Sequence, residues 1–173
     1  HRYIRRQRQM CIRDRWDEAQ YMLKQLVDGH AVRVGRENVL RIDIPQSAVI
    51  LPSGLRMFYE DLQLDPAPKG VEPEDVWPEY SYKTRRGRKN IYGGKVVENV
   101  CQALARCIIG EQMLLINQKY KSVMTVHDSI AICCPDEDVV QARAHVEQCM
   151  RHVPSWAAGL PLECESGVGK SYG

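Results

Sequence analysis

The sequence lacks any apolar run long enough to span a lipid bilayer, which takes about 20 consecutive residues. It also lacks a leader in which a charged segment precedes an apolar one and a small-residue cleavage site follows. These absences exclude the integral membrane and secretory classes. We therefore expect a soluble, cytoplasmic, unsecreted protein with no membrane partner.

Cysteine patterns that bind metals are absent as well. Seven cysteines occur, but none form a C-x-x-C pair, and no two histidines have the spacing of a ligand pair. Cys133 and Cys134 are adjacent in a predicted strand, where side chains alternate between faces. A zinc-binding nucleic-acid module is therefore a poor hypothesis. We expect the following to be small buried hydrophobes in a reducing compartment: Cys101, Cys107, Cys149 and Cys164.

A phosphate-binding P-loop is excluded by spacing. Gly169-Lys170-Ser171 resembles the end of that motif, but the position that must be the first glycine is Cys164. The motif also needs a following helix, and we expect none after Ser171. We expect this segment to belong to a final strand instead.

At 173 residues, the chain has the length of about one domain. The first 15 residues stand apart because they are rich in arginine and have little apolar periodicity. We interpret residues 1–15 as a non-native or disordered basic segment, with a DNA-binding arm as the alternative. A short helix ended by Gly29 is expected next, with these apolar positions: Trp16, Ala19, Met22, Leu23, Leu26 and Val27.

The net charge of +2 conceals an uneven distribution. The stretch from Glu60 to Glu79 is acidic and interrupted by prolines, which indicates a surface loop. A basic cluster follows, with a turn expected at Gly87 and with tyrosines interleaved. It can bind phosphates or form a solvated basic loop. Its members are Lys83, Arg85, Arg86, Arg88, Lys89 and Lys95.

The most informative pattern is a short turn between two predicted strands. The strands Ser122–Val126 and Ile130–Cys134 contain β-branched residues and flank His127-Asp128-Ser129. Asp128 is therefore expected at the tip of a hairpin. A carboxylate there can bind a metal ion, or it can simply be a solvated turn residue.

A long amphipathic helix is predicted before this hairpin, from Ile91 to about Tyr120. Its apolar stripe consists of Val97, Val100, Leu104, Ile108 and Leu115. Another side carries long hydrogen-bond donors at steps of four, three and four residues: Lys95, Asn99, Gln102 and Arg106. Such a row can contact a nucleic-acid groove and its phosphates, or it can be a solvated face.

The hairpin is followed by Asp136, Glu137 and Asp138, whose negative charges favour the start of another helix. A last strand is expected over Pro161–Val168. Together these elements predict an α+β fold in which a small antiparallel sheet packs against helices.

Four segments resemble the C-terminal palm region of the A-family DNA polymerases, the DNA polymerase I family, and most closely its bacteriophage members. They are Leu51–Tyr59, Tyr92–Arg106, Val126–Ile130, and Gly159–Glu163 with Gly167–Gly173. The Gly-Gly-Lys-Val-Val-Glu-Asn helix followed by the His-Asp hairpin is the most specific part. The resemblance makes residues 16–173 the C-terminal part of a polymerase palm, with the end of the fingers region near residues 16–45.

This resemblance implies a DNA-directed DNA polymerase of DNA replication, which acts on primer–template DNA and deoxynucleoside triphosphates. Two Mg²⁺ ions would assist attack of the primer 3′-hydroxyl on the α-phosphate. Asp128 would be the catalytic metal ligand, and His127 would contact DNA near the primer terminus. A phage-encoded enzyme would act in the host cytoplasm. The implied DNA contacts are Gln102 in the minor groove together with Asn99, Lys95, Arg106, Arg85, Arg86, Arg88 and Lys89.

Two positions depart from the family pattern. Ser129 stands where the family commonly has Glu, and Cys107 where it often has an acid. Ser129 leaves open a single-subunit phage-type RNA polymerase, because that class shares the palm and a His-Asp-Ser turn.

Polymerases of this family also have an Asp-Tyr-Ser-type motif that supplies a first metal-binding carboxylate, and a fingers helix that grips the triphosphate. Neither is found in the sequence. One carboxylate cannot hold two divalent ions against their mutual repulsion. We therefore expect the isolated chain to be an inactive C-terminal fragment. A non-catalytic, DNA-binding remnant is the remaining alternative.

Overall fold

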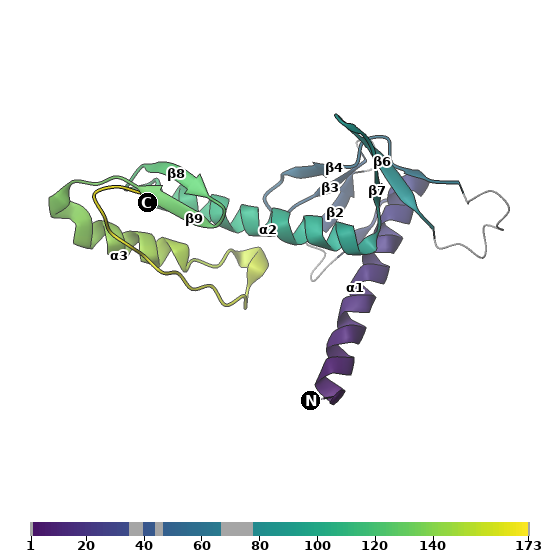
Figure 1. Ribbon diagram of the computed structural model, residues 1–173, viewed down its shortest axis with the longest axis horizontal. Helices are drawn as coiled ribbons and strands as arrows, with labels where there is room; N and C mark the ends of the chain where they lie inside the picture. Colours follow the sequence, from purple (N-terminus) through teal and green to yellow (C-terminus); the bar gives the residue numbers. More distant parts are fainter. Residues whose placement is uncertain (1, 35–39, 44–46, 67–77, 173) are drawn as a thin grey trace. The chain divides into compact units, whose positions relative to one another are not determined.

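The computed structural model describes residues 2–34, 40–43, 47–66 and 78–172 (Figure 1). The chain divides into two compact units, His1–Gln102 and Ala103–Gly173. The helix α2 (Gly93–Ile116) begins in the first unit and ends in the second. Helices alternate with small antiparallel sheets, so the predicted α+β class is confirmed.

The first unit combines α1 (Arg2–Asp28) with two antiparallel sheets, of strand orders β1-β2-β3-β4 and β5-β6-β7. The strands are β1 (Arg33–Val34), β2 (Leu40–Asp43), β3 (Ala48–Ile50), β4 (Arg56–Phe58), β5 (Gln63–Leu64), β6 (Tyr80–Thr84) and β7 (Gly87–Ile91). The segment Leu51–Tyr59, which belongs to the polymerase resemblance, contains the strand β4. The predicted acidic loop is interrupted by β5, and its residues 67–77 lie outside the described part of the chain.

The helix α1 ends where the sequence predicts. Gly29 has a φ of 74°, and the backbone N–H of His30 donates to the carbonyl of Gln25 over 2.9 Å, which is a Schellman-type helix end. Met22 and Leu23 are fully buried, whereas Trp16 is 49% exposed. The helix begins at Arg2, and the interpretation of residues 1–15 as non-native stays a prediction.

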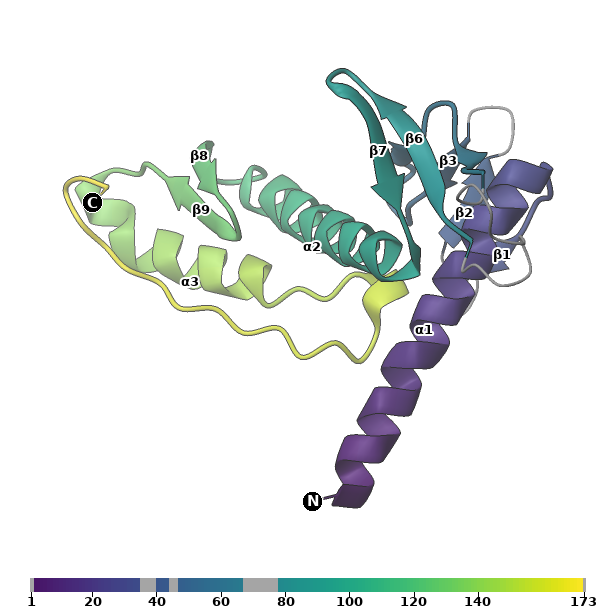
Figure 2. The same ribbon diagram turned by 45° about the vertical axis from the view of Figure 1, so that its right-hand side comes forward.

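The start of α2 packs closely against α1. A Cβ atom at Gly93 would lie 2.2 Å from the backbone oxygen of Trp16, so only glycine fits at this crossing. The side-chain amide of Gln20 accepts from the N–H of Gly93 over 2.7 Å and donates to the carbonyl of Pro78 over 2.9 Å. This one side chain therefore caps α2 and fixes the segment that enters β6. Figure 2 shows the start of α2 beside α1.

The second unit contains the end of α2, a two-stranded hairpin and a further helix. Its elements are β8 (Ser122–Val126), β9 (Ser129–Ile132), the 3₁₀-helix η3 (Asp136–Asp138), α3 (Val139–Met150) and the 3₁₀-helix η4 (Ser155–Ala157). The predicted acidic helix start is confirmed, since η3 leads directly into α3. Within the unit, the buried amide of Gln112 on α2 donates to the carbonyls of Met150 and His152 at the end of α3.

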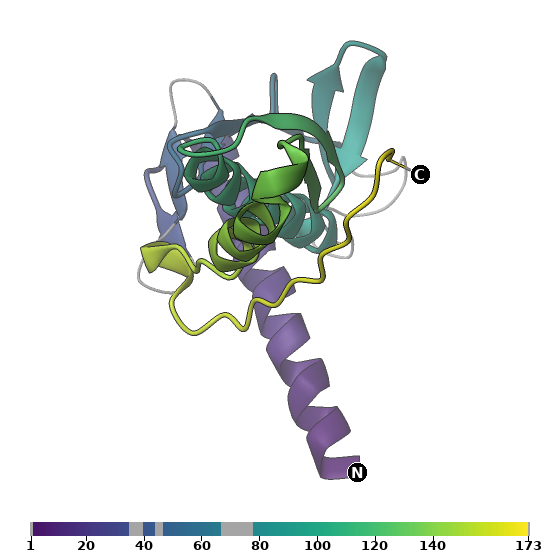
Figure 3. The same ribbon diagram turned by 90° about the vertical axis from the view of Figure 1, so that its left-hand side faces the viewer.

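The prediction of a strand over Pro161–Val168 is wrong. The chain from 160 to 172, the yellow segment in Figure 3, contains no strand. Among the described residues, β8 and β9 pair with each other and with no third strand. Pro161 cannot donate to a strand ladder, and this segment is instead tied to other residues of its unit by side chains. The Sγ atom of Cys164 and the hydroxyl of Ser166 both bond to Glu147, and Lys170 pairs with Asp136.

Burial corrects two further predictions. In the apolar stripe predicted for α2, Ile108 is buried but Val97 is only half-buried, and the fully buried positions of the helix are Val96, Gln112 and Ile116. Of the cysteines expected to be buried, Cys101 is exposed. Cys133 and Cys134 lie beyond the end of β9 at Ile132, so they are not strand neighbours. None of the helices in the described residues is apolar and long enough to cross a membrane.

Candidate functional site

The β8–β9 hairpin places His127 and Asp128 at its tip, as predicted. Val126 pairs with Ser129, which leaves these two residues as the whole turn. His127 has a φ of 53°, a conformation that β-branched residues avoid and that tight hairpin turns require. Both side chains are exposed. The turn therefore presents one imidazole and one carboxylate to the outside of the second unit.

The surroundings of Asp128 decide what it can bind. Within the described residues, its carboxylate has no ion-pair partner, and no group of three or more His, Cys, Asp and Glu side chains could hold a metal ion. Mg²⁺ in proteins commonly has only one or two carboxylate ligands and completes its shell with water and substrate phosphates. An exposed, unpaired carboxylate fits that role as one ligand. The described residues do not contain a complete metal site.

The row of hydrogen-bond donors on α2 consists of Lys95, Asn99, Gln102 and Arg106. Some of these donors already have partners within the chain. Lys95 Nζ pairs with Glu98 Oε2 at 2.7 Å, and the amide of Gln102 lies 3.4 Å from the other carboxylate oxygen. The hydrogen bond to Glu98 raises the pKa of Lys95 above its ordinary value of 10.5. Glu98 was missed by the sequence analysis, although its i+3 and i+4 spacing to Lys95 and Gln102 could have indicated it. Both donors are exposed, so solvent or a ligand can compete for them.

Asn99 has a different environment from the other donors. Its amide lies 3.4 Å from the hydroxyl of Tyr59, which is 3% exposed and packs edge-on against Tyr82 with ring centroids 5.4 Å apart. Burial raises the pKa of Tyr59, and the hydrogen bond from Asn99 partly offsets that effect. Asn99 is thus half-buried and connected to the first unit's core. By contrast, Arg106 is exposed and has no partner among the described residues.

The members of the basic cluster other than Lys95, which lies on α2, belong to the β6–β7 hairpin. Thr84 pairs with Gly87, so Arg85 and Arg86 are the turn, and the turn lies just before the predicted position at Gly87, whose φ is 106°. Both turn arginines and Lys89 are exposed, and the side chains of all three have no hydrogen-bond or ion-pair partner in the described part of the chain. These three side chains are available to an anionic ligand.

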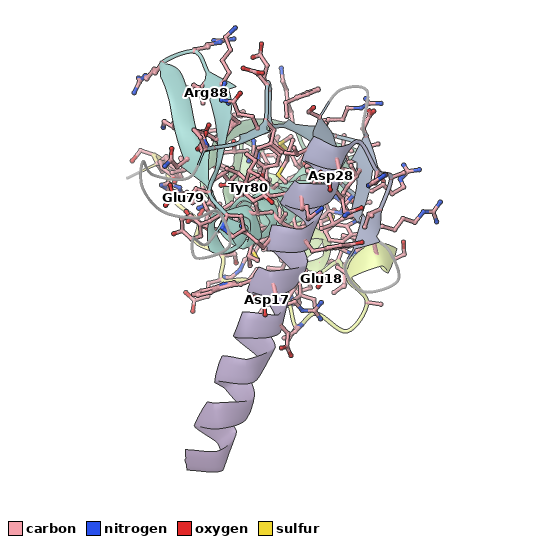
Figure 4. The ribbon with its side chains drawn as sticks, turned by 90° about the vertical axis from the view of Figure 1, so that its right-hand side faces the viewer. Asp17, Glu18, Asp28, Glu79, Tyr80 and Arg88 are labelled. Atoms are coloured by element: carbon pink, nitrogen blue, oxygen red, sulfur yellow. The ribbon has the colours of Figure 1, made fainter. Side chains whose placement is uncertain are left out.

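Arg88 is different because it is bonded within the first unit. Its guanidinium donates to the carboxylate of Asp61 over 2.6 Å and to the hydroxyl of Ser81 over 3.1 Å. It also donates to the carbonyl oxygens of both residues. Ser81 is buried and donates in turn to Asp65 over 2.6 Å. Figure 4 shows Arg88 on the β6–β7 hairpin, well away from the acidic residues of α1. Its contacts give it a structural role, whether or not it also touches a ligand.

One curated protein carries a clear sequence similarity. The chain is 37% identical over 128 residues to the DNA polymerase of Bacillus phage SP02, covering 72% of this chain and 19% of that polymerase. The chain thus spans about a fifth of the length of the relative it matches. No family model matches the chain, and no solved structure matches it. The similarity supports a relationship to a DNA polymerase.

Proposed function

We propose that this chain is the palm segment of an A-family, phage-type DNA polymerase that carries the second metal-binding carboxylate. The observation that supports it most is Asp128, exposed and unpaired at the tip of a two-residue hairpin, in a chain similar to a phage DNA polymerase. The parent enzyme would transfer deoxynucleotides to a primer in replication. The remaining metal ligands and the triphosphate site would come from other parts of that enzyme.

In this proposal, Asp128 contributes a carboxylate oxygen to a divalent metal site. The metal ions lower the pKa of the attacking hydroxyl and neutralise charge on the leaving group. His127, next to Asp128 in the turn, contacts DNA near the primer terminus. The tight turn orients both side chains, because a two-residue loop leaves little conformational freedom between the paired residues Val126 and Ser129.

The DNA contacts divide into two groups. Gln102 donates to minor-groove acceptors, which are nearly the same for all base pairs and so report pairing without selecting a base. It must exchange its weak contact with Glu98 for one with DNA. Lys95, Arg106, Arg85, Arg86 and Lys89 contact phosphates, which positions the duplex without reading its sequence. Asn99 acts mainly through Tyr59, and Arg88 mainly through Asp61.

The test is a chimera in which this chain replaces the matching segment of the Bacillus phage SP02 polymerase. Templated primer extension with deoxynucleotides would support the proposal. Preference for ribonucleotides would favour an RNA polymerase, the alternative that Ser129 suggests. A chimera that folds and binds primer–template DNA but incorporates neither would favour a non-catalytic DNA-binding remnant.

A further inference from the structure

The first unit has an exposed aromatic pair that the proposed catalytic and duplex contacts do not use. Trp16 on α1 is 49% exposed and Tyr92, just before α2, is 58% exposed. Both rings border Gly94. A Cβ atom at that glycine would lie 3.0 Å from Cε2 of Tyr92 and 3.4 Å from Cε2 of Trp16. The missing side chain therefore lets both rings lie against the first turn of α2 at Gly94.

The two rings have unused binding capacity. The ring contacts among the described residues are Tyr59 with Tyr82 and Tyr120 with His145, so Trp16 and Tyr92 do not stack on each other. Within the same described residues, the indole N–H of Trp16 and the hydroxyl of Tyr92 have no hydrogen-bond partner. The pair thus offers aromatic surface and two polar donors to one ligand.

The charges around the pair indicate the ligand. Lys95 follows Gly94 directly, and its ion pair with Glu98 is an exposed i,i+3 contact of the kind that contributes little and can be exchanged for a phosphate. The basic β6–β7 hairpin ends at Ile91, one residue before Tyr92. Asp17 and Glu18, labelled on α1 in Figure 4, follow Trp16 in the sequence. Because their carboxylates repel phosphates, we expect the phosphates next to Lys95.

We propose that Trp16 and Tyr92 form a stacking site for an unpaired base of single-stranded DNA, with Lys95 contacting the adjacent phosphate. Aromatic side chains next to cations bind single strands without sequence preference, because every base has a π-face. The choice of DNA as partner rests on the proposed polymerase function, in which part of the template is unpaired. A protein partner with an apolar surface would be expected to bind a patch of aliphatic side chains. The Trp16–Tyr92 pair instead adjoins the cation Lys95.

The test uses the chain labelled with 5-fluorotryptophan and a short oligo(dT). The ¹⁹F resonance of Trp16, assigned with Trp16→Phe, should shift on titration, while that of Trp156 should not. An abasic strand of the same length, which has phosphates but no bases, should leave the Trp16 resonance in place. No shift with oligo(dT), or an equal shift with the abasic strand, overturns the proposal.

Affinity provides the second readout. Trp16→Ala and Tyr92→Ala should each weaken oligo(dT) binding roughly tenfold, and Trp16→Phe should largely restore it. Tyr21→Ala is the matched control, since Tyr21 is a 52% exposed aromatic on the same helix, and should change affinity less than about twofold. Unchanged affinity in both aromatic variants would overturn the proposal.

The outcomes separate this inference from the proposed function. A chimera that extends primers, combined with no response of Trp16 to oligo(dT), refutes the stacking site alone. A Trp16 response in a chain whose chimera folds and binds primer–template DNA but incorporates no nucleotide refutes the polymerase assignment and leaves the single-strand site standing.

Discussion

The side-chain oxygen of Gln20 accepts a hydrogen bond of 2.7 Å from the backbone N–H of Gly93, the first residue of α2. An amide from one helix thus caps the next. The glycine is needed at this position because the carbonyl of Trp16 leaves no room for a Cβ atom. The Gly-Gly pair that contributes to the polymerase resemblance therefore has a packing role in this fold.

Gly93→Ala should destabilise the chain by about 1–3 kcal/mol, because backbone atoms of α1 must move to relieve the contact. Gly110→Ala is the matched control in the same helix, since a Cβ atom there would meet nothing within 4 Å. It should stabilise the chain by up to about 1 kcal/mol through helix propensity. Urea unfolding of the two variants checks both signs, and a neutral Gly93→Ala would refute the close crossing.

Arg85→Ala combined with Arg86→Ala should weaken duplex DNA binding without changing the fold, because both side chains are exposed at the β6–β7 turn. For every phosphate that the variant no longer neutralises, the slope of log affinity against log salt should fall in magnitude by about 0.9. Fluorescence anisotropy at several salt concentrations measures this slope. Arg88→Ala should instead lower the unfolding midpoint, because it removes the bonds to Asp61 and Ser81. An unchanged slope in the double variant would remove the turn from the DNA interface.

Glu147 should make stability depend on pH. Hydrogen bonds from Ser166 and Arg143 lower the pKa of its carboxyl below the ordinary 4.5. Its stabilising contribution is therefore complete above about pH 4.5 and is lost as the pH falls through the lowered pKa. The unfolding midpoint of wild-type chain should exceed that of Glu147→Gln at pH 6, and the difference should shrink on acidification. Glu163→Gln, at an exposed position of the same unit, should follow the wild type throughout.

Structural features that depend on local sequence patterns could be predicted from the sequence. Turn chemistry predicts the tip of the hairpin at His127 and Asp128. A glycine at the helix end predicts the end of α1 at Gly29. Negative charge at a helix start predicts the acidic start of α3. The α+β class follows from the same elements.

Features that depend on contacts between distant residues could not be predicted. A strand was predicted over Pro161–Val168, but bonds from Cys164 and Ser166 to Glu147 hold that segment in an irregular conformation. The donor row on α2 was visible as spacing, yet the bond from Asn99 to Tyr59 spans 40 residues of sequence and has no local signal. The half-exposure of Trp16 was missed because its spacing matches the buried positions of α1.

The central claim is that Asp128 is a catalytic metal ligand. Its most direct test is single-turnover primer extension by the chimeric polymerase carrying Asp128→Asn, beside Asp138→Asn, an aspartate outside the hairpin turn in the same unit. The account predicts that Asp128→Asn nearly abolishes incorporation and leaves primer–template affinity within a few-fold of the parent, while Asp138→Asn retains activity. Normal incorporation by Asp128→Asn would contradict it.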